Sequence, residues 1–232
     1  MRREIPTAAS VPRAIRARLL DGIDHYDELI AKAIATAKVS LWIATANVKE
    51  LRVEAPVGTA ARARGRFVSI LDTLAALKRQ GVELRFLHGG IPSRPFREEL
   101  ARQPRLRDGG LPMRQCPRVH LKLVAIDGRL LYLGSANFTG AGLGAKGEGR
   151  RNFELGMLTD DDVWLDAAQE RFDRVWSGRE CKGCKLRGVC PAPIDTTYAR
   201  AAHGNRATTA TAASAVKPTK PRRPRKVNPS KP

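Results

Sequence analysis

The chain has 232 residues, of which 42% are hydrophobic, and a formal net charge of +19. This length supports one main core, so we expect a single domain with appendages. The longest apolar run, residues 39–48, is too short to span a bilayer, and the first 18 residues contain five arginines but no apolar stretch of the secretory type. We therefore expect a cytoplasmic protein without a transmembrane segment.

The positive charge extends over the whole chain. Residues 196–232 contain nine Lys or Arg and no Asp or Glu, so this tail carries +9 and the first 195 residues carry 19 minus 9, or +10. Such a distribution favours a polyanionic partner, bound through phosphate contacts that salt weakens. A general bias toward arginine would also explain the charge of the body. The Ala, Thr, Pro and Lys/Arg content of the tail predicts disorder.

The first half of the chain predicts alternating helices and strands. Residues 1–20 are expected to form a basic arm. After it we expect a helix over 24–37, a buried strand over 39–46, an aperiodic loop over 48–65, a helix over 66–80 ended by Gly81, and a strand over 82–87. His88 follows that strand and is interpreted as a hydrogen-bonded turn residue. Residues 94–118 carry seven arginines against three acids, which fits either a substrate track or a solvated helix and loop.

The next segment predicts a hairpin with polar chemistry at one end. A strand over 119–126 would place His120 and Lys122 on one face, because side chains alternate along a strand. Asp127 and Gly128 form a typical two-residue turn, and residues 129–133 return as the second strand. The return delivers Gly134, Ser135 and Asn137 to the end where the histidine and lysine lie. An imidazole, an ammonium, a hydroxyl and an amide together suit a phosphate.

Residues 140–149 hold five glycines and are expected to form a mobile flap beside these groups. A strand over 153–158 follows, and Asp160 or Asp161 is expected to cap a helix over 162–176. This alternation predicts an α/β fold with a mixed β-sheet flanked by helices on both faces.

The pattern H-x-K-x4-D-x6-G-S-x-N, from His120 to Asn137, resembles the phospholipase D superfamily, as does N-x-E at residues 152–154. The resemblance covers roughly residues 24–176 and implies a phospholipase D-like sandwich. It implies catalytic roles for His120, Lys122, Asn137 and Glu154 and a supporting contact from Ser135. We interpret Asp127 as a structural turn residue that supports the site.

The resemblance also implies a mechanism. One histidine attacks phosphorus to form a phosphohistidine, a second protonates the leaving group, and no metal is needed. This chain has four histidines, but His25, His88 and His203 lack a lysine two residues on. We therefore expect a homodimer that brings two copies of His120 together. Glu154 would orient the ring, and the paired histidines would give a bell-shaped pH profile.

The four cysteines are Cys116, Cys181, Cys184 and Cys190. The C-x2-C-x5-C spacing with a distant fourth cysteine resembles the four-iron four-sulfur clamp of certain RecB-like nucleases. Four thiolates would equally suit structural zinc, and reduced thiols without metal are a further alternative.

The sequence therefore divides into a basic arm (1–20), a catalytic domain (21–178), a cysteine-rich segment (179–195) and a basic tail (196–232). The leading hypothesis is a metal-independent phosphodiesterase acting on nucleic acid, specifically a DNA nuclease. A phospholipase D acting on phospholipid headgroups is the alternative, since anionic membranes also attract basic tails. A nucleic-acid-binding protein without turnover is the second alternative.

Overall fold

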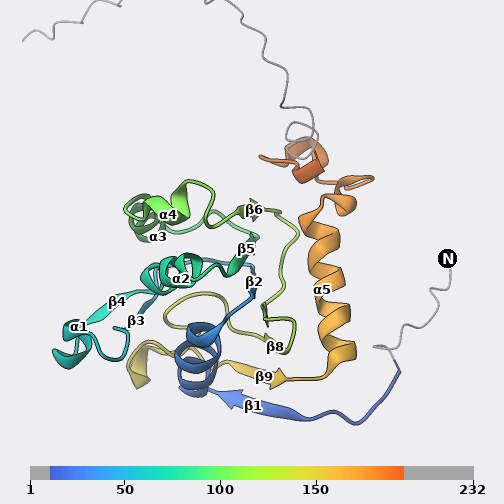
Figure 1. Cartoon of the computed structure of the whole chain (residues 1–232). Helices are drawn as coiled ribbons and strands as arrows, with labels where there is room; N and C mark the ends of the chain where they lie inside the picture. The colour runs from blue at the N-terminus through green and yellow to red at the C-terminus, as the bar shows by residue number, and fades with distance from the viewer. Residues whose placement is uncertain (1–10, 196–232) are drawn as a thin grey trace, which may run out of the picture.

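The computed structural model describes residues 11–195, and a mixed sheet forms its centre (Figure 1). The seven strands have the order β1-β9-β8-β7-β2-β5-β6. Their bounds are β1 (Ala17–Asp21), β2 (Ser40–Thr45), β5 (Glu83–His88), β6 (Met113–Gln115), β7 (Leu123–Ile126), β8 (Leu130–Gly134) and β9 (Leu155–Thr159). The β2–β5 and β5–β6 pairs are parallel and the other pairs are antiparallel. The predicted α/β class with a mixed sheet is confirmed.

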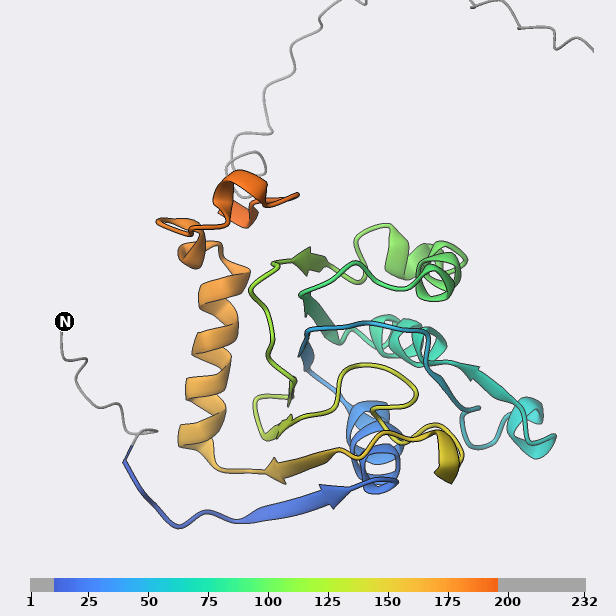
Figure 2. The ribbon, with the colours of Figure 1, turned by 180° about the vertical axis from the view of Figure 1, so that it is seen from behind.

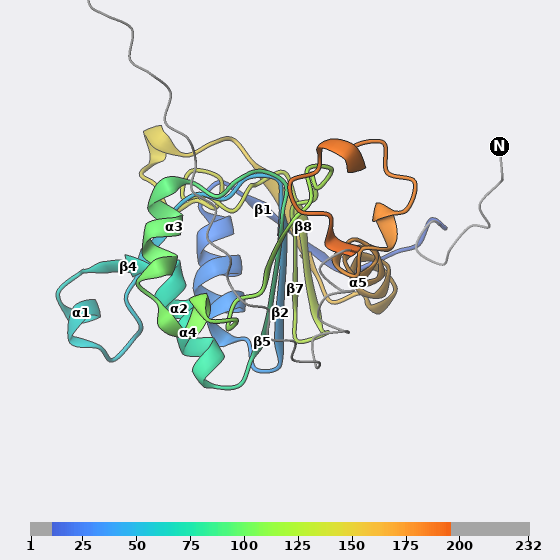
Figure 3. The ribbon, with the colours of Figure 1, turned by 90° about the horizontal axis from the view of Figure 1, so that it is seen from above.

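Helices cover the two faces of this sheet (Figure 3). A π-helix (His25–Ala33), continued by a 3₁₀ turn (Ile34–Thr36), shares one face with α2 (Ile70–Arg79), α3 (Arg94–Ala101) and α4 (Pro104–Arg107). On the other face, α5 (Asp162–Trp176) is the one α-helix among residues 11–195, and the 3₁₀ turns Arg179–Cys181 and Arg187–Val189 lie at its end (Figure 2). Each face has its own buried apolar cluster. Within residues 11–195, no helix is long and apolar enough to cross a membrane.

The α2 helix begins four residues later than expected. Residues 67–69 form β4 (Phe67–Ser69), which pairs with β3 (Arg52–Glu54) in a separate two-stranded sheet. Ser69 then caps α2 and Asp72 completes a capping box, so the helix starts where its N–H groups find acceptors. The predicted loop over 48–65 likewise contains β3 and the short helix α1 (Ala60–Ala63). The helix predicted over 66–80 therefore included the three residues of β4, because the apolar spacing of the sequence did not distinguish the strand from the helix.

The predicted basic arm does not extend to residue 20. Residues 17–21 form β1, which pairs with β9 at the edge of the sheet, so the domain begins earlier than the predicted boundary at residue 21. Leu20 is fully buried, which gives this short strand an apolar anchor. Residues 1–10 of the arm and the tail 196–232 lie outside the described residues.

The strand that was expected over 119–126 is shorter than predicted. β7 begins at Leu123, so His120 and Lys122 precede it rather than lie on it. The Val119 N–H donates to the Cys116 carbonyl at 2.8 Å, which makes a turn just ahead of the histidine. Ladder pairing begins only at Leu123, which lies opposite Ala44 and Leu133. The alternation that placed both polar side chains on one strand face was therefore wrong.

The glycine-rich segment is packed over its first half. Gly140, Gly142 and Gly144 are buried, whereas residues 146–150 are exposed and include a 3₁₀ turn (Glu148–Arg150). A Cβ atom on Gly142 would lie 2.7 Å from the Asn137 carbonyl oxygen. Glycine is thus used here for close backbone approach beside Asn137, and the prediction of a flap over all of 140–149 was wrong.

Candidate active site

The His120 and Lys122 side chains lie close together although both residues precede β7. The Lys122 Nζ atom is 3.0 Å from Nδ1 and 3.2 Å from Nε2 of the His120 ring, and it donates to the His120 carbonyl at 3.0 Å. The His120 residue is exposed, and the Lys122 carbonyl accepts from the Gly134 N–H at 3.2 Å. A phosphate oxygen bound by this ammonium would therefore bring phosphorus close to a ring nitrogen.

The side chain of Asn137 is held through its amide oxygen, Oδ1. Its Oδ1 atom accepts from the Asn47 N–H at 3.1 Å and lies 3.3 Å from the Thr45 hydroxyl. Because an amide has one acceptor end and one donor end, the Nδ2 amino group is the end that can meet a phosphate oxygen. Thr45 is buried at the end of β2, and sequence reasoning missed it. Its signal was a hydroxyl at the end of a buried strand, two residues before Asn47.

Glu154 lies in a hydrogen-bonded group with two neighbours. The Ser135 hydroxyl donates to Glu154 Oε2, and the Asn152 side-chain amide donates to Oε1 at 3.1 Å. The Leu155 N–H donates to the Ser135 hydroxyl at 3.1 Å, which fixes Ser135 against the start of β9. Within residues 11–195, no hydrogen bond joins this carboxylate to the His120 ring. The orienting role of Glu154 toward His120 remains a prediction.

The Glu154 charge nevertheless acts on Lys122. Loss of solvation lowers the pKa of the Lys122 ammonium below its usual value, and the nearby Glu154 carboxylate opposes this by favouring the charged form. The carboxylate therefore helps to keep the lysine cationic. A cation is the form that can compensate charge on a phosphate.

A buried histidine lies behind the carboxylate. His25 is fully buried, and its ring meets the Tyr132 ring edge-on at 5.7 Å. Burial lowers the pKa of His25, and both the Gly22 carbonyl and the Glu154 charge oppose that shift. A Cβ on Gly134 or Gly156 would lie 2.3 Å and 2.5 Å from atoms of the Tyr132 side chain. Gly134, the glycine of the G-S-x-N motif, therefore leaves room for the buried Tyr132 side chain, which a larger residue at position 134 would contact too closely.

Asp127 lies at the far end of β7 from this group. Its carboxylate accepts from the backbone N–H groups of Lys38 at 3.0 Å, Val39 at 2.7 Å and Ser40 at 3.0 Å. Its φ angle is +56°, a left-handed conformation that Asp tolerates better than most residues. Partial burial raises the pKa of this carboxyl, but the three N–H groups outweigh burial and hold it below its usual value. These contacts support the structural interpretation of Asp127.

Two hollows border the site. One is lined by residues of the His120 segment together with Arg171 and Glu180. The other lies beside Asn137 and has a polar lining that includes Asn47, Lys49, Glu50, Lys146 and Asn152. The other histidine considered, His88, is buried, and its Nδ1 lies 2.8 Å from the Gly90 carbonyl oxygen. The hydrogen bond was expected, but His88 is the last residue of β5 rather than part of the turn that follows it.

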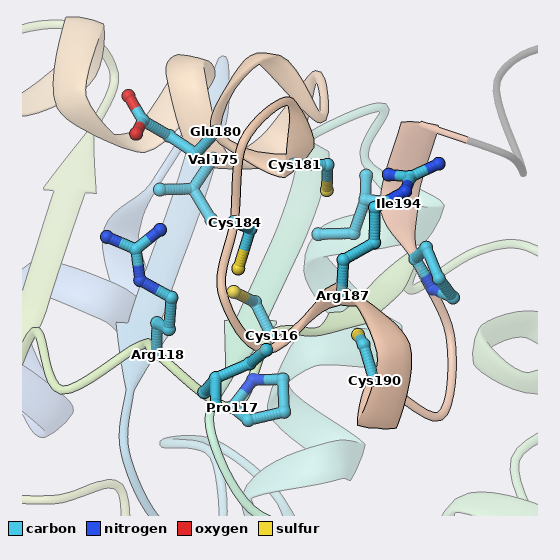
Figure 4. A pocket seen from close by; sticks show the side chains of 12 residues that line it. Cys116, Pro117, Arg118, Val175, Glu180, Cys181, Cys184, Arg187, Cys190 and Ile194 are labelled. Carbon is cyan, nitrogen blue, oxygen red and sulfur yellow. The ribbon is translucent and has the colours of Figure 1, made fainter.

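The four predicted cysteine ligands gather around a third cavity (Figure 4). Cys116 comes from the segment before His120, and the other three, Cys181, Cys184 and Cys190, come from the segment after α5. All four are half-buried free thiols. Among the described residues, no group of three or more His, Cys, Asp or Glu side chains is arranged to hold a single metal ion.

The chain is similar to known proteins in sequence pattern and in fold. Residues 30–176 match the family model described as "Cardiolipin synthase, PLD-like domain". A phospholipase D family member, Nuc from Salmonella typhimurium, superposes with a TM-score of 0.50 at 19% identity over 71% of this chain and 95% of that one. NucT from Helicobacter pylori has a TM-score of 0.47 at 15% identity, over 69% of this chain and 95% of that one. Phosphatidylserine synthase from Haemophilus influenzae has a TM-score of 0.42 at 17% identity, over 69% of this chain and 38% of that one. No curated protein sequence matches.

Because the family model spans more than half of the chain, the protein belongs to the phospholipase D superfamily. Its class is thus that of the phospholipase D-like phosphodiesterases. The likeness to Nuc, at 19% identity, extends to the fold alone.

Proposed function

We propose that the protein is a metal-independent phosphodiesterase that cleaves DNA in an active site shared by two copies of the chain. The observation that carries the proposal is the pairing of the exposed His120 ring with Lys122 Nζ at 3.0 to 3.2 Å. An ammonium at this distance can bind a nonbridging phosphate oxygen and so hold phosphorus within reach of the ring nitrogen that attacks it. His120 is the one histidine of the four with a lysine two residues on.

The chemistry needs two histidines. In the first step, a His120 ring nitrogen attacks phosphorus and forms a P–N bond while the P–O bond to the leaving alkoxide breaks. His120 of the second copy gives that oxygen its proton. Water then attacks the phosphohistidine, loses a proton to the second histidine and releases the phosphate product. Lys122 and the Asn137 amide compensate the charge on the nonbridging oxygens throughout.

The groove beside Asn137 supports a nucleic-acid substrate. Exposed Lys49 and Lys146 line it with the side chains of Asn47 and Asn152, whereas Glu50 is its one acidic residue. Burial raises the pKa of Glu50, which favours its neutral form. Cations and amides along a groove suit successive phosphates of a strand. The overall charge of +19 acts in the same direction.

An apolar patch beside the site supports a second copy as the partner. Phe153 is 105% exposed, and Leu19 and Leu155 are 67% and 56% exposed. Leu19 and Leu155 lie on one face of the β1–β9 ladder, because Leu19 pairs with Met157 and Asp21 pairs with Leu155. Phe153 directly precedes Glu154. A two-fold contact that covers this patch would bring two sites together and remove the exposed phenyl rings from water.

The test is a substrate panel in EDTA. Wild type should nick supercoiled plasmid and leave phosphatidylcholine and cardiolipin vesicles intact, whereas His120→Ala should lose about 1,000-fold or more of that activity. Arg79→Ala, which removes an exposed charge at the end of α2, is the matched control and should retain activity. Lipid hydrolysis without nicking would assign the protein to phospholipids instead. Salt-sensitive DNA binding with no cleavage would assign it to binding alone.

A further inference from the structure

We propose that Cys116, Cys181, Cys184 and Cys190 bind a four-iron four-sulfur cluster that fastens the segment after α5 to the segment carrying His120. This site lies apart from the phosphodiesterase chemistry, so the proposal holds or fails independently of the proposed function. Its basis is the convergence of four thiols on one cavity, three from residues 181–190 and one, Cys116, more than 60 residues earlier in the chain.

The backbone of the cysteine segment directs its thiols to that cavity. The N–H of Cys184 donates to the Cys181 carbonyl at 3.2 Å, and the N–H of Arg187 donates to the Cys184 carbonyl at 3.1 Å. Gly183 has a φ of +74°, so the turn between Cys181 and Cys184 needs a glycine. These consecutive tight turns bring three cysteines around one space, as Figure 4 shows.

The segment is anchored at both ends of the cavity. Gly178 ends α5 with a φ of +78°, and a Cβ there would lie 2.7 Å from the Asp195 nitrogen, so residue 195 returns to the end of the helix. Ile194 is 3% exposed and belongs to the same apolar cluster as Cys116 and Cys181. The fourth cysteine, Cys116, is held by its N–H, which donates to the His88 carbonyl at 2.9 Å. The protein thus holds the four thiols around one cavity.

The geometry favours a cluster over one zinc ion. Zinc holds four sulfurs at about 2.3 Å from a single point, so the thiols of a zinc site almost touch. Here no three ligand-type side chains in residues 11–195 are arranged around such a point, yet all four cysteines border the same cavity. A cluster places its four irons at separate corners and takes one thiolate at each, so its cysteines surround a space rather than a single point. The four thiols would lose their protons on binding.

The surroundings suit a thiolate-bound, negatively charged centre. Arg118 and Arg187 line the cavity with the cysteines. Glu180 also lines it and is ion-paired to Arg174 at 2.8 Å. The rest of the wall is largely apolar, formed by Val175, Leu186 and Ile194 among others. Cations beside the thiolates compensate their charge, and the apolar wall limits access of water to the cluster.

The cluster site is contiguous with the catalytic segment. Cys116 and Arg118 line both this cavity and the hollow around His120, and Val175 and Glu180 are also shared. Cys116 lies four residues before His120, and the Val119 N–H is bonded to the Cys116 carbonyl at 2.8 Å. A cluster bound to Cys116 would therefore restrain the non-strand segment that holds the histidine.

The test measures metal, not cleavage. Full-length protein purified without oxygen should contain iron and acid-labile sulfide at about four of each per chain, with broad visible absorption that bleaches in air. Cys184→Ser should lose most of the iron and the colour, and so should Cys116→Ser, which removes the distant ligand. Lys185→Ala, an exposed neighbour of Cys184, is the matched control and should keep both.

Each other result decides against the proposal. Stoichiometric zinc without iron would replace the cluster by a zinc site. Colourless, metal-free protein that takes up no iron when supplied with ferrous iron and sulfide would overturn the site altogether. Iron that persists in Cys116→Ser, with circular dichroism showing a folded chain in both variants, would remove the link to the histidine segment.

Discussion

The carboxylate of Asp127 is expected to stabilise the fold without taking part in the chemistry. It accepts three backbone N–H groups at 2.7 to 3.0 Å, from the residues that lead into β2. Hydrogen bonds to charged groups contribute about 1.5 to 3 kcal/mol each, and water can replace part of them at a half-buried turn. We therefore expect Asp127→Ala to lower the free energy of unfolding by about 3 kcal/mol, including the strain of alanine at a φ of +56°.

A loss of that size should lower the melting temperature by roughly 6 to 12 °C for a chain of this length. Asp127→Asn keeps one acceptor oxygen and tolerates the left-handed backbone, so its loss should be about 1 to 2 kcal/mol. Asp166→Ala, at an exposed position of α5, is the control and should stay within about 0.5 kcal/mol. The measurement is urea unfolding followed by circular dichroism.

The pH dependence provides a second check on Asp127. The folded-state pKa of this carboxyl is below its usual value, so its contribution is present above the unfolded pKa and is lost as pH falls through the folded pKa. The difference in stability between wild type and Asp127→Asn should therefore shrink below about pH 4. The interpretation fails if the variant is as stable as wild type at neutral pH but its folded form cleaves no phosphodiester.

Three further predictions concern the groups around the carboxylate of the site. Glu154→Gln removes a charge that favours protonated Lys122, so the pKa of Lys122 should fall further. The alkaline limb of the pH–rate profile should then move to lower pH. A limb that does not move would contradict the coupling between Glu154 and Lys122. Burial lowers the pKa of His25, so the unfolded chain binds this proton more readily than the folded chain does. The free energy of unfolding should therefore decrease as pH drops below about 6.5, and it should decrease less steeply in His25→Gln. Equal pH slopes for the two proteins in urea unfolding would exclude this role. Gly156→Ala places a Cβ 2.5 Å from the Tyr132 ring and should cost about 1 to 3 kcal/mol in thermal unfolding, whereas an unchanged melting temperature would show that the tyrosine can move aside.

The sequence predicted the hairpin and its motif well because both depend on local chemistry. Asp127 and Gly128 have positive φ angles and make the turn, and Asp161 caps α5 by accepting from the Trp164 N–H at 2.9 Å. The pattern of residue types along 120–137 then placed the polar groups at one end of the hairpin.

The errors arose where tertiary pairing decides the structure. β1 exists because residues 17–21 find a partner in β9, a contact that no local pattern indicates. The strand predicted over 119–126 does not reach back to His120 because pairing begins only at Leu123. The role of Thr45 in holding Asn137 depends on two segments more than 90 residues apart, which sequence alone does not bring together.

The central claim is that two copies of His120 form one active site, and mixing subunits tests it most directly. Wild-type and His120→Ala chains are unfolded together, refolded at varied ratios and assayed on plasmid in EDTA. If each site needs both histidines, activity should fall with the square of the wild-type fraction, since a mixed dimer is inactive. A linear decrease would show that each chain acts alone and would contradict the shared site.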